Sequence, residues 1–215
     1  MITSDGSTTI HLPDWDEQYH SKNGAIQEAY HVFIKAGFEK FSQKNIAILE
    51  IGFGTGLNTF ITFLEAERAS KKTHYVGVEA YPVLSDELKK LNYISELKAA
   101  NKQEIFTKIH SVSWDEKHII SDDFSLTKRK QFFDQIDDVN QFDLIYFDAF
   151  GAKNQPELWT EEIFAKMFAA LKQNGILVTY SAKGSVRRAM QAVGFLVERL
   201  PGPPGKREML RAIKK

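Results

Sequence analysis

The stretch LEIGFGTGLNTF, residues 49–60, contains the residues best suited to binding a nucleotide-like ligand. An acid, Glu50, precedes glycines at positions 52, 54 and 56, which allow a tight turn and close contact between a ligand and the backbone. The dinucleotide fingerprint GxGxxG requires glycine where this chain has Leu57, and the phosphate-binding GxxxxGK motif is absent. The pattern Glu-x-Gly-x-Gly-x-Gly is typical of enzymes that use S-adenosylmethionine.

Two further acids stand where predicted strands end. Glu79 closes the run YVGVEA, and Asp148 follows the run DLIYF. The carboxyl ends of parallel strands line the ligand crevice of such folds, and an acid in the place of Glu79 meets ribose hydroxyls. Glu50 is expected to face the same crevice, where it suits the cationic amino group of S-adenosylmethionine and repels the pyrophosphate of NAD.

Asp148 is the candidate for the reaction itself. Three roles are open to it: orienting a methyl acceptor, accepting its proton, or binding the amine of the cofactor. Phe150, two residues further on, packs either on the cofactor or a base, or within the core.

A parallel sheet is needed to bring these strand ends together. The apolar runs typical of buried strands are 45–52, 73–80, 106–114, 142–150 and 175–182. The predicted helices are 23–41, 57–70, 83–97, 160–172 and 185–194. Alternating strands and helices predict a parallel sheet covered on both faces, and 195–200 with 207–213 predict a terminal antiparallel pair.

The predicted fold class is therefore α/β: a Rossmann-like, S-adenosylmethionine-dependent methyltransferase fold with a mostly parallel, seven-stranded sheet. We expect one methyltransferase domain over 1–215, with an N-terminal extension and helix at 1–44 and the core at 45–215. Residues 1–20 are expected to form short strands and turns. Residues 118–133 are expected to form an inserted hairpin, in which TKRK, 127–130, is a solvated edge.

Composition narrows the class of protein. The chain has no cysteine, no signal peptide and no apolar run long enough to span a membrane, which predicts a soluble, cytoplasmic protein. Its six histidines have no metal-ligand spacing, so no metal is expected, and no GxSxG motif suggests hydrolysis.

The net charge of zero hides an asymmetry. Residues 172–215 contain ten Lys or Arg and only two Asp or Glu, so a basic end follows an acidic body. Such a distribution is either an electrostatic footprint for nucleic acid or a solvated basic tail.

Several pieces of the chain resemble one known family, the methyltransferase domain of the tRNA-modifying enzyme MnmC and its stand-alone relatives, called MnmD. The pieces are TSDGSTTI, DEQYHSKNGAIQEAYHVFI, LEIGFGTGLNTF, YVGVEAYP, FDLIYFDAFGAKNQPELWT, GILVTYSAKGSVRRAMQAVGF and LPGPPGKREMLRA. They cover most of the chain in order and leave out chiefly residues 84–140. Where many methyltransferases place an acid after the third strand to meet adenine, HSVSWDE offers Ser113, with Asp115 displaced.

The resemblance implies a set of site residues. It implies that S-adenosylmethionine contacts Ser21, Glu50, Gly52, Phe53, Gly54, Gly56, Asn58, Glu79, Ala80, Asp148 and Phe150. Asp148 is expected to act catalytically, assisted by the hydroxyl of Tyr19. The basic residues expected to bind tRNA are Lys153, Lys183, Arg187, Arg188, Lys206 and Arg207.

The resemblance also implies the reaction, methylation of 5-aminomethyl-(2-thio)uridine to 5-methylaminomethyl-(2-thio)uridine at the tRNA wobble position. Upstream enzymes are expected to supply the aminomethyl group. Asp148 acts as orienter and base, or only orients an amine that water has already deprotonated. Two alternatives are a methyltransferase acting on a small molecule or protein, and a tRNA-binding module without catalysis.

Overall fold

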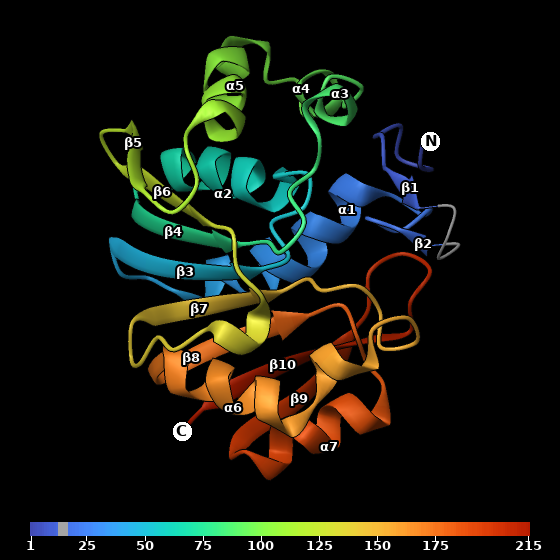
Figure 1. Ribbon diagram of the computed structural model, residues 1–215, viewed down its shortest axis with the longest axis vertical. Helices are drawn as coiled ribbons and strands as arrows, with labels where there is room; N and C mark the ends of the chain where they lie inside the picture. Colours follow the sequence, from blue (N-terminus) through green and yellow to red (C-terminus); the bar gives the residue numbers. More distant parts are fainter. Residues whose placement is uncertain (13–16) are drawn as a thin grey trace.

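The computed structural model describes residues 1–12 and 17–215, and an eight-stranded sheet forms its centre (Figure 1). The strand order is β5-β6-β4-β3-β7-β8-β10-β9. The parallel strands are β3 (Asn45–Ile51), β4 (Lys72–Val78), β6 (Phe124–Arg129), β7 (Phe142–Phe147) and β8 (Leu171–Thr179). The antiparallel strands are β5 (Lys117–Ser121), β9 (Phe195–Pro201) and β10 (Glu208–Lys214). The α/β class and the terminal antiparallel pair are confirmed, with eight strands rather than seven because β5 adds to the edge.

Helices cover both faces of the sheet, because successive strand residues point to opposite sides. One buried apolar cluster holds Tyr75 and Tyr146, and the next residue on each strand, Val76 or Phe147, belongs to the other. The helices of the first cluster are α1 (Ala25–Ala29), the π-helix η2 (Tyr30–Lys35), α2 (Leu57–Arg68) and α5 (Gln103–Ser111). The second cluster contains α6 (Glu161–Ala170) and α7 (Gly184–Ala192). Figure 1 shows α2 and α5 beside the β4–β6 half of the sheet, and α6 and α7 beside the β8–β9 half.

The prediction of a third strand at 106–114 is wrong. Most of this segment belongs to helix α5, which buries Phe106 and Ile109 at helical spacing. The strand parallel to β4 is β6, and the predicted hairpin at 118–133 is this strand paired with β5. The hairpin is therefore part of the sheet and not an insertion.

Lys128 explains why β6 was misread as a solvated edge. Its side chain is almost fully buried, donates to the His110 carbonyl oxygen at 2.7 Å, and lies 5.0 Å from the Trp114 ring centroid. Burial lowers the pKa of Lys128 to about 8. The strand alternates buried and partly buried residues, with a lysine at a position where an apolar residue is the usual choice.

Two predicted helices are divided into shorter pieces. The segment 83–97 forms α3 (Ser85–Leu88) and α4 (Tyr93–Glu96), because Asn92 between them binds the N-terminal segment. Its side chain accepts from the Thr8 amide at 2.7 Å and donates to the Gly6 carbonyl at 2.9 Å. The segment 23–41 begins as α1, continues as η2 and ends in the 3₁₀-helix η3 (Phe38–Lys40).

The N-terminal segment contains a two-stranded hairpin. Strands β1 (His11–Leu12) and β2 (Glu17–Gln18) pair antiparallel, and residues 13–16 between them lie outside the described part of the chain. Shorter elements complete the structure: the 3₁₀-helices η4 (Ala100–Lys102), η5 (Phe133–Gln135) and η6 (Pro156–Trp159). Across the described residues, no helix combines the length and apolar character that a membrane span needs.

The connection from β6 to β7 is fastened by a buried ion pair. Arg129 donates to both carboxylate oxygens of Asp138, at 2.6 and 3.1 Å, and the Asp138 side chain is only 4% exposed. This bidentate contact closes the loop that carries η5. The loop leads from β6, the strand next to the edge strand β5, past β4 and β3 to β7.

We expect Asp138→Ala to lower the free energy of unfolding by about 2 kcal/mol, because it leaves the Arg129 guanidinium unpaired. Urea denaturation measures this change. Asp137→Ala is the matched control: Asp137 is exposed, and its replacement is expected to change stability by less than about 0.5 kcal/mol. Equal effects of the two substitutions contradict the role assigned to the ion pair.

Candidate functional site

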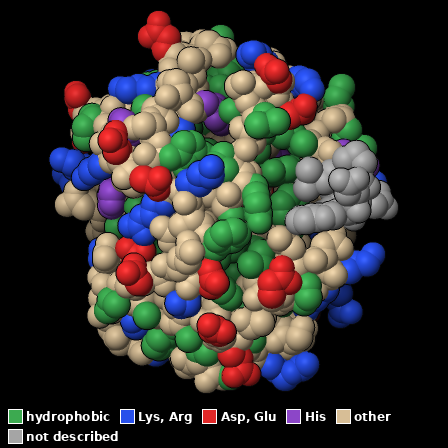
Figure 2. Space-filling model, in the orientation of Figure 1, with side chains coloured by type: hydrophobic (Ala, Val, Ile, Leu, Met, Phe, Trp, Pro, Cys, Tyr) green, Lys and Arg blue, Asp and Glu red, His purple; other side chains and the backbone are tan. Residues whose placement is uncertain are grey.

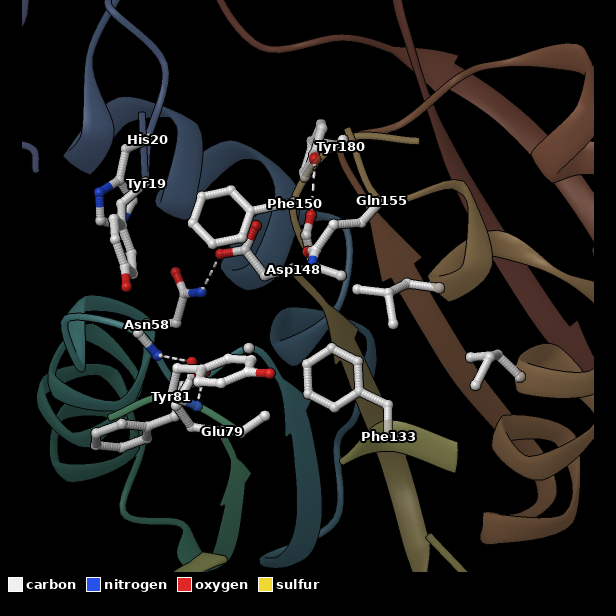
Figure 3. A pocket seen from close by; sticks show the side chains of 18 of the residues that line it. Tyr19, His20, Asn58, Glu79, Tyr81, Phe133, Asp148, Phe150, Gln155 and Tyr180 are labelled. Carbon is white, nitrogen blue, oxygen red and sulfur yellow. Dashed lines mark hydrogen bonds between the residues drawn. The ribbon is translucent and has the colours of Figure 1, made fainter. Parts of the chain in front are cut away.

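A cavity of about 1040 Å³ opens at the carboxyl ends of the parallel strands (Figure 3). The chain runs outward from β3 to β4 and β6 in one direction, then returns to β7 on the other side of β3. Ligands of open α/β sheets bind at such a topological switch point. The cavity is lined by the glycine loop, the ends of β4 and β7, the N-terminal segment and the loop before β10.

Close packing against backbone at one position and against a side chain at the other explains two glycines of the loop after β3. Gly52 has a φ of +88°, and a Cβ there would lie 2.6 Å from the Asp148 carbonyl oxygen. Gly54 has a φ of +49°, and a Cβ there would lie 3.1 Å from the Tyr19 ring. Both glycines line the cavity, so a larger residue would strain the backbone and fill the space at once.

Glu79 holds the glycine loop against the end of β4. Its two carboxylate oxygens accept from the Gly54 and Tyr81 amides, each at 3.0 Å. Burial raises the pKa of Glu79 above its ordinary value, while these amide contacts oppose the rise. Figure 3 shows Glu79 and Tyr81 together on one wall of the cavity, across from Asp148.

Asp148 stands at the end of β7 and faces the cavity. Its Oδ2 accepts from the Asn58 side-chain amide at 2.8 Å, and its backbone amide donates to the Ile51 carbonyl at 2.9 Å. Burial, followed by the nearby Glu28 charge, raises the pKa of Asp148 to about 7. A carboxyl with this pKa can both accept and release a proton near neutral pH.

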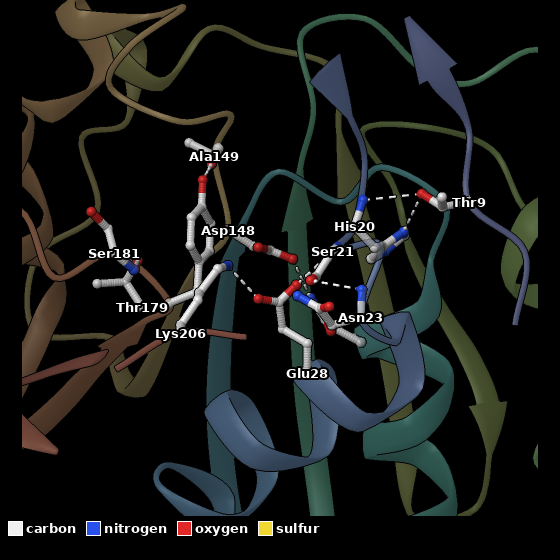
Figure 4. Close-up of polar contacts among 12 residues, drawn as sticks. Thr9, His20, Ser21, Asn23, Glu28, Asp148, Ala149, Thr179, Ser181 and Lys206 are labelled. Carbon is white, nitrogen blue, oxygen red and sulfur yellow. Dashed lines mark hydrogen bonds and ion pairs between the residues drawn. The ribbon is translucent and has the colours of Figure 1, made fainter. Parts of the chain in front are cut away.

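A second carboxylate, Glu28, lies beside Asp148 (Figure 4). It comes from α1, is almost fully buried, and accepts from the Ser21 amide at 3.1 Å. Its other oxygen forms an ion pair with Lys206 from the loop before β10. The Lys206 nitrogen lies 3.9 Å from the centroid of the Tyr180 ring.

Aromatic side chains form two further parts of the wall. Tyr19 and Phe150 meet edge to face with ring centroids 5.0 Å apart, and burial, then the Glu79 charge, raises the pKa of Tyr19 to about 12. Tyr81 and Phe132 form a similar pair at 5.9 Å, and both side chains are more than half exposed. Phe150 therefore lies at the cavity surface and not wholly within the core.

The loop after β6 supplies an acid that the sequence interpretation missed. Phe133 and Asp134 line the cavity five residues or fewer beyond the end of β6. Since this is the true third parallel strand, Asp134, and not Ser113 or Asp115, follows it. The sequence signal for this strand is the alternation in FSLTKR, residues 124–129. The alternation is complete only when Lys128 is counted among the buried residues.

The structure brings most of the predicted cofactor residues together. The predicted residues that line the cavity are Tyr19, Ser21, Gly52, Phe53, Gly54, Asn58, Glu79, Ala80, Asp148, Phe150 and Lys206. The lining residues that the sequence did not indicate include Glu28, Asp134 and Tyr180. Glu28 belongs to no sequence motif that would mark it as a site residue. It reaches the strand ends only because α1 packs against the sheet.

Glu50 and Gly56 differ from their predicted places. Glu50 is fully buried behind the cavity wall, where its Oε2 accepts from the Thr59 hydroxyl at 3.1 Å. Burial, then the Asp148 charge, raises the pKa of Glu50 to about 8, so it does not present the charge predicted for it directly to the crevice. Gly56 is the N-cap of α2, and a Cβ there would lie 2.9 Å from the His110 ring.

The basic C-terminal region is partly neutralised by ion pairs. Lys172 pairs with Asp143, and Arg211 pairs with Glu198. Within the described residues, no ion pair is formed by Lys153, Lys183, Arg187, Arg188 or Arg207, which all lie outside the cavity lining. Figure 2 shows Lys and Arg side chains at the edge of the molecule near α7 and the C-terminal loop. Lys206, predicted to bind tRNA, lines the cavity and forms an ion pair with Glu28.

The charge of the cavity wall suits cationic ligands. Among the described residues, those that line it with an acidic side chain are Glu28, Glu79, Asp134, Asp148, Glu157 and Glu162, against one lysine, Lys206. Figure 2 shows Asp and Glu side chains below the apolar surface at its centre. Among residues 1–12 and 17–215, no cluster of three His, Cys, Asp or Glu has the arrangement of a metal site.

Asn58 gives a specific reason to expect an ammonium group here. Its Oδ1 is buried and, within the described part of the chain, has no hydrogen-bond partner, while its amide nitrogen is bound to Asp148. A buried acceptor without a donor is costly, and a bound cation with N–H donors removes that cost.

Comparison with known proteins identifies relatives of the whole chain. A family model described as S-adenosyl-L-methionine-dependent methyltransferase matches residues 91–215. The chain is 27% identical over 226 residues to the tRNA 5-methylaminomethyl-2-thiouridine biosynthesis bifunctional protein MnmC of Pseudomonas entomophila, covering 99% of this chain and 35% of that protein. It is 31% identical over 218 residues to the protein of the same name from a Marinomonas species, covering 93% of this chain and 31% of that protein. The chain thus spans about a third of the length of these curated relatives.

Solved structures share the fold. The crystal structure of MNMC2 from Aquifex aeolicus matches with a TM-score of 0.75 and 23% identity, covering 98% of this chain and 68% of that chain. Spermidine synthase from Thermotoga maritima matches with a TM-score of 0.55 and 13% identity, covering 97% of this chain and 68% of that chain. These two likenesses show that the overall fold of this chain is also found in solved structures.

The raised pKa of Asp148 implies that the stability of the folded protein depends on pH. The ordinary pKa of Asp148 is 3.8 and its pKa in the folded protein is about 7. Below pH 4 the carboxyl is protonated in the folded protein, so it does not lower the free energy of unfolding. Above pH 7 it is ionised in its buried position, and it lowers the free energy of unfolding most. We expect Asp148→Asn to raise stability at pH 8 by about 2 kcal/mol, or Tm by about 4–8 °C. The gain is expected to shrink as the pH falls from 8 to 4.

Thermal unfolding followed by circular dichroism at several pH values measures this. Asp137→Asn, at an exposed position, is the control for a general effect of lost charge. A gain from Asp148→Asn that is the same at pH 4 and pH 8 contradicts the raised pKa.

Proposed function

Because the chain belongs to a family of S-adenosyl-L-methionine-dependent methyltransferases, we propose that it methylates 5-aminomethyl-(2-thio)uridine at the wobble position of tRNA. The product is 5-methylaminomethyl-(2-thio)uridine. The observation that carries this proposal is the pair of carboxylates, Glu28 and Asp148, side by side in an acidic cavity. The two MnmC relatives, whose name specifies 5-methylaminomethyl-2-thiouridine biosynthesis, match over nearly the whole chain and support the choice of substrate.

The cavity residues fit the cofactor. When bound, S-adenosylmethionine supplies the electrophilic methyl group. Asn58 Oδ1 would accept from its amino group, and Glu79 stands at the strand end where it would meet the ribose hydroxyls. The open backbone at Gly52 and Gly54 leaves room for it, and Phe133 and Asp134 stand where an adenine ring is met.

Asp148 acts on the acceptor amine. An aliphatic amine with a pKa of about 10 is protonated at neutral pH, and freeing its lone pair costs about 4 kcal/mol. The Asp148 carboxylate accepts a hydrogen bond from the ammonium, and its own raised pKa allows it to take the proton. Asn58 holds the carboxylate in one orientation, so the amine is positioned as well as deprotonated.

Tyr19 closes the cavity beside the reacting atoms. Its ring packs on Phe150 and against the glycine loop, and its raised pKa keeps the hydroxyl protonated and able to donate. The aromatic pair therefore excludes water from the side of the cavity next to Asp148.

The tRNA approaches along the basic residues near the cavity. A wobble base lies in a single-stranded loop and can be turned out into a pocket at modest cost. Lys183 just before α7, Arg187 and Arg188 within it, and Arg207 in the last loop then bind phosphates of the anticodon stem. Other enzymes install the aminomethyl group before this chain acts.

Incubating the purified protein with S-adenosylmethionine and tRNA that carries 5-aminomethyl-(2-thio)uridine tests the proposal. We expect mass spectrometry of the digested nucleosides to show a gain of one methyl group at the wobble uridine. Transfer to a protein or small molecule with no change in the wobble nucleoside refutes the substrate assignment.

Asp148→Asn is expected to lower kcat by about 10²–10³-fold with little change in affinity for the cofactor, because it removes the proton acceptor and keeps the shape. Steady-state kinetics and equilibrium binding of S-adenosylmethionine separate the two effects. Asp143→Asn, at the other end of β7, is the control and is expected to retain kcat. A loss of cofactor affinity equal to the loss of kcat would assign Asp148 to binding alone.

Replacing Lys183, Arg187 and Arg188 together by Gln is expected to weaken tRNA binding and to reduce the slope of log affinity against log salt by about two to three. The matched control replaces Lys40, Lys44 and Lys72, exposed near the amino ends of β3 and β4, by Gln. Fluorescence binding titrations at several salt concentrations provide the slopes. Equal slopes for both triple variants would reject the basic surface.

A further inference from the structure

Lys206 lies inside the cavity although its place in the sequence suggests the surface. It follows the glycine- and proline-rich turn between β9 and β10, and only 32% of its side chain is exposed. Its ammonium forms an ion pair with Glu28 and lies over the Tyr180 ring at 3.9 Å from the centroid. Figure 4 shows the ammonium directed toward both the Glu28 and Asp148 carboxylates.

The groups around this ammonium are held by other parts of the protein and do not depend on Lys206 for their positions. Glu28 accepts from the Ser21 amide at 3.1 Å, and Asp148 accepts from the Asn58 side chain at 2.8 Å. The Tyr180 hydroxyl donates to the Ala149 carbonyl at 2.8 Å, which holds the ring in place. Two carboxylates and an aromatic face therefore form a fixed cation site.

The occupant of this site has the same chemistry as the proposed acceptor. A lysine side chain ends in a methylene that carries a primary ammonium, as an aminomethyl group does. A primary ammonium has three N–H donors, which match two carboxylates, and a compact charge, which matches an aromatic face. A neutral hydroxyl of the same size offers one donor and leaves the carboxylates uncompensated.

We propose that Glu28, Asp148 and Tyr180 form the subsite for the primary ammonium of the acceptor, and that Lys206 is its internal occupant, displaced when the acceptor binds. This inference deepens the proposed function, on which it rests for the identity of the acceptor. The site selects a cation over a neutral acceptor because the acceptor must replace the charge that Lys206 provides. Lys206 compensates the charge of Glu28 and Asp148 before the acceptor binds, and the acceptor ammonium takes its place on binding.

The backbone of the turn that carries Lys206 is fixed by its own hydrogen bond and by close packing. Gly205, just before it, has a φ of +81°, and a Cβ there would overlap the Asn23 side chain. The Lys206 amide donates to the Pro203 carbonyl at 2.9 Å, so the turn is closed upon itself. Rotation of the Lys206 side chain away from the cavity leaves this turn unchanged and brings its charge to the side of the exposed Arg207.

Binding of two nucleosides to the full chain, with S-adenosylhomocysteine present, tests this. The probes are 5-aminomethyluridine and its neutral counterpart 5-hydroxymethyluridine, measured by calorimetry with wild type and Lys206→Met. We expect the variant to bind the amine about tenfold more tightly, because the competing ammonium is gone, and to bind the hydroxyl probe within twofold of wild type. Lys214→Met is the control, since Lys214 also lies over an aromatic ring, Phe168, outside the cavity.

Three outcomes overturn the proposal: Lys206→Met binds the amine no more tightly, it gains equally for both probes, or Lys214→Met has the same effect. Glu28→Gln supplies a second measurement and is expected to abolish the preference for the amine; a retained preference also overturns it. Cooperative thermal unfolding of each variant shows that it is folded.

A simpler probe pair separates this inference from the proposed function. Benzylammonium and benzyl alcohol test the cation site without any reference to tRNA. Tighter benzylammonium binding by Lys206→Met, together with no methylation of the wobble nucleoside by wild type, supports the cation site and refutes the tRNA substrate. Unchanged benzylammonium binding with normal wobble methylation refutes the cation site and supports the tRNA substrate.

Discussion

The close approach of two backbone segments at the centre of the sheet is the constraint on which the site depends. The Gly52 Cα and the Asp148 carbonyl lie so near each other that a Cβ at position 52 would stand 2.6 Å from the oxygen. The Asp148 amide donates to the Ile51 carbonyl, and the Gly52 amide donates to the Val78 carbonyl. These contacts join the ends of three strands into one edge. Because these backbone contacts hold the three strand ends together, the glycine loop, Glu79 and Asp148 face one cavity.

Electrostatics then decides what this edge can bind. Burial raises the pKa of Asp148 to about 7 and that of Glu50, behind it, to about 8, and Glu28 adds a third carboxylate. Such a concentration of buried acids is costly unless cations compensate it. Lys206 supplies one cation, and the ligands proposed here, a sulfonium cofactor with an amino group and an aminomethyl base, supply others. In the proposed function, the acidic interior binds the amine of the substrate and the basic exterior near α7 binds its phosphates.

The cavity is lined by residues from both ends of the chain as well as by the ends of the central strands. Glu28, Ser21 and Tyr19 come from the N-terminal segment, and Lys206 comes from the last loop. Their side chains are brought together across more than 170 residues of sequence, as in the pair between Lys206 and Glu28. The N-terminal segment and the last loop therefore form part of the cavity wall, and the central strands alone would leave the cavity open on that side.

By itself, the sequence determined the α/β class, the glycine loop after β3, and the acids at the ends of β4 and β7, because these depend on local periodicity and on backbone conformations that few residues adopt. The prediction of the third strand at 106–114 is wrong for two reasons. The buried Lys128 interrupts the apolar pattern of the true strand, β6. The apolar residues of α5, taken over a few positions, have a spacing that also fits a strand. Only the tertiary structure decided that Glu50 lies behind the wall, that Asp134 follows the third strand, and that Lys206 points inward. Charge and burial of a side chain depend on partners far away in the chain, and no local pattern contains that information.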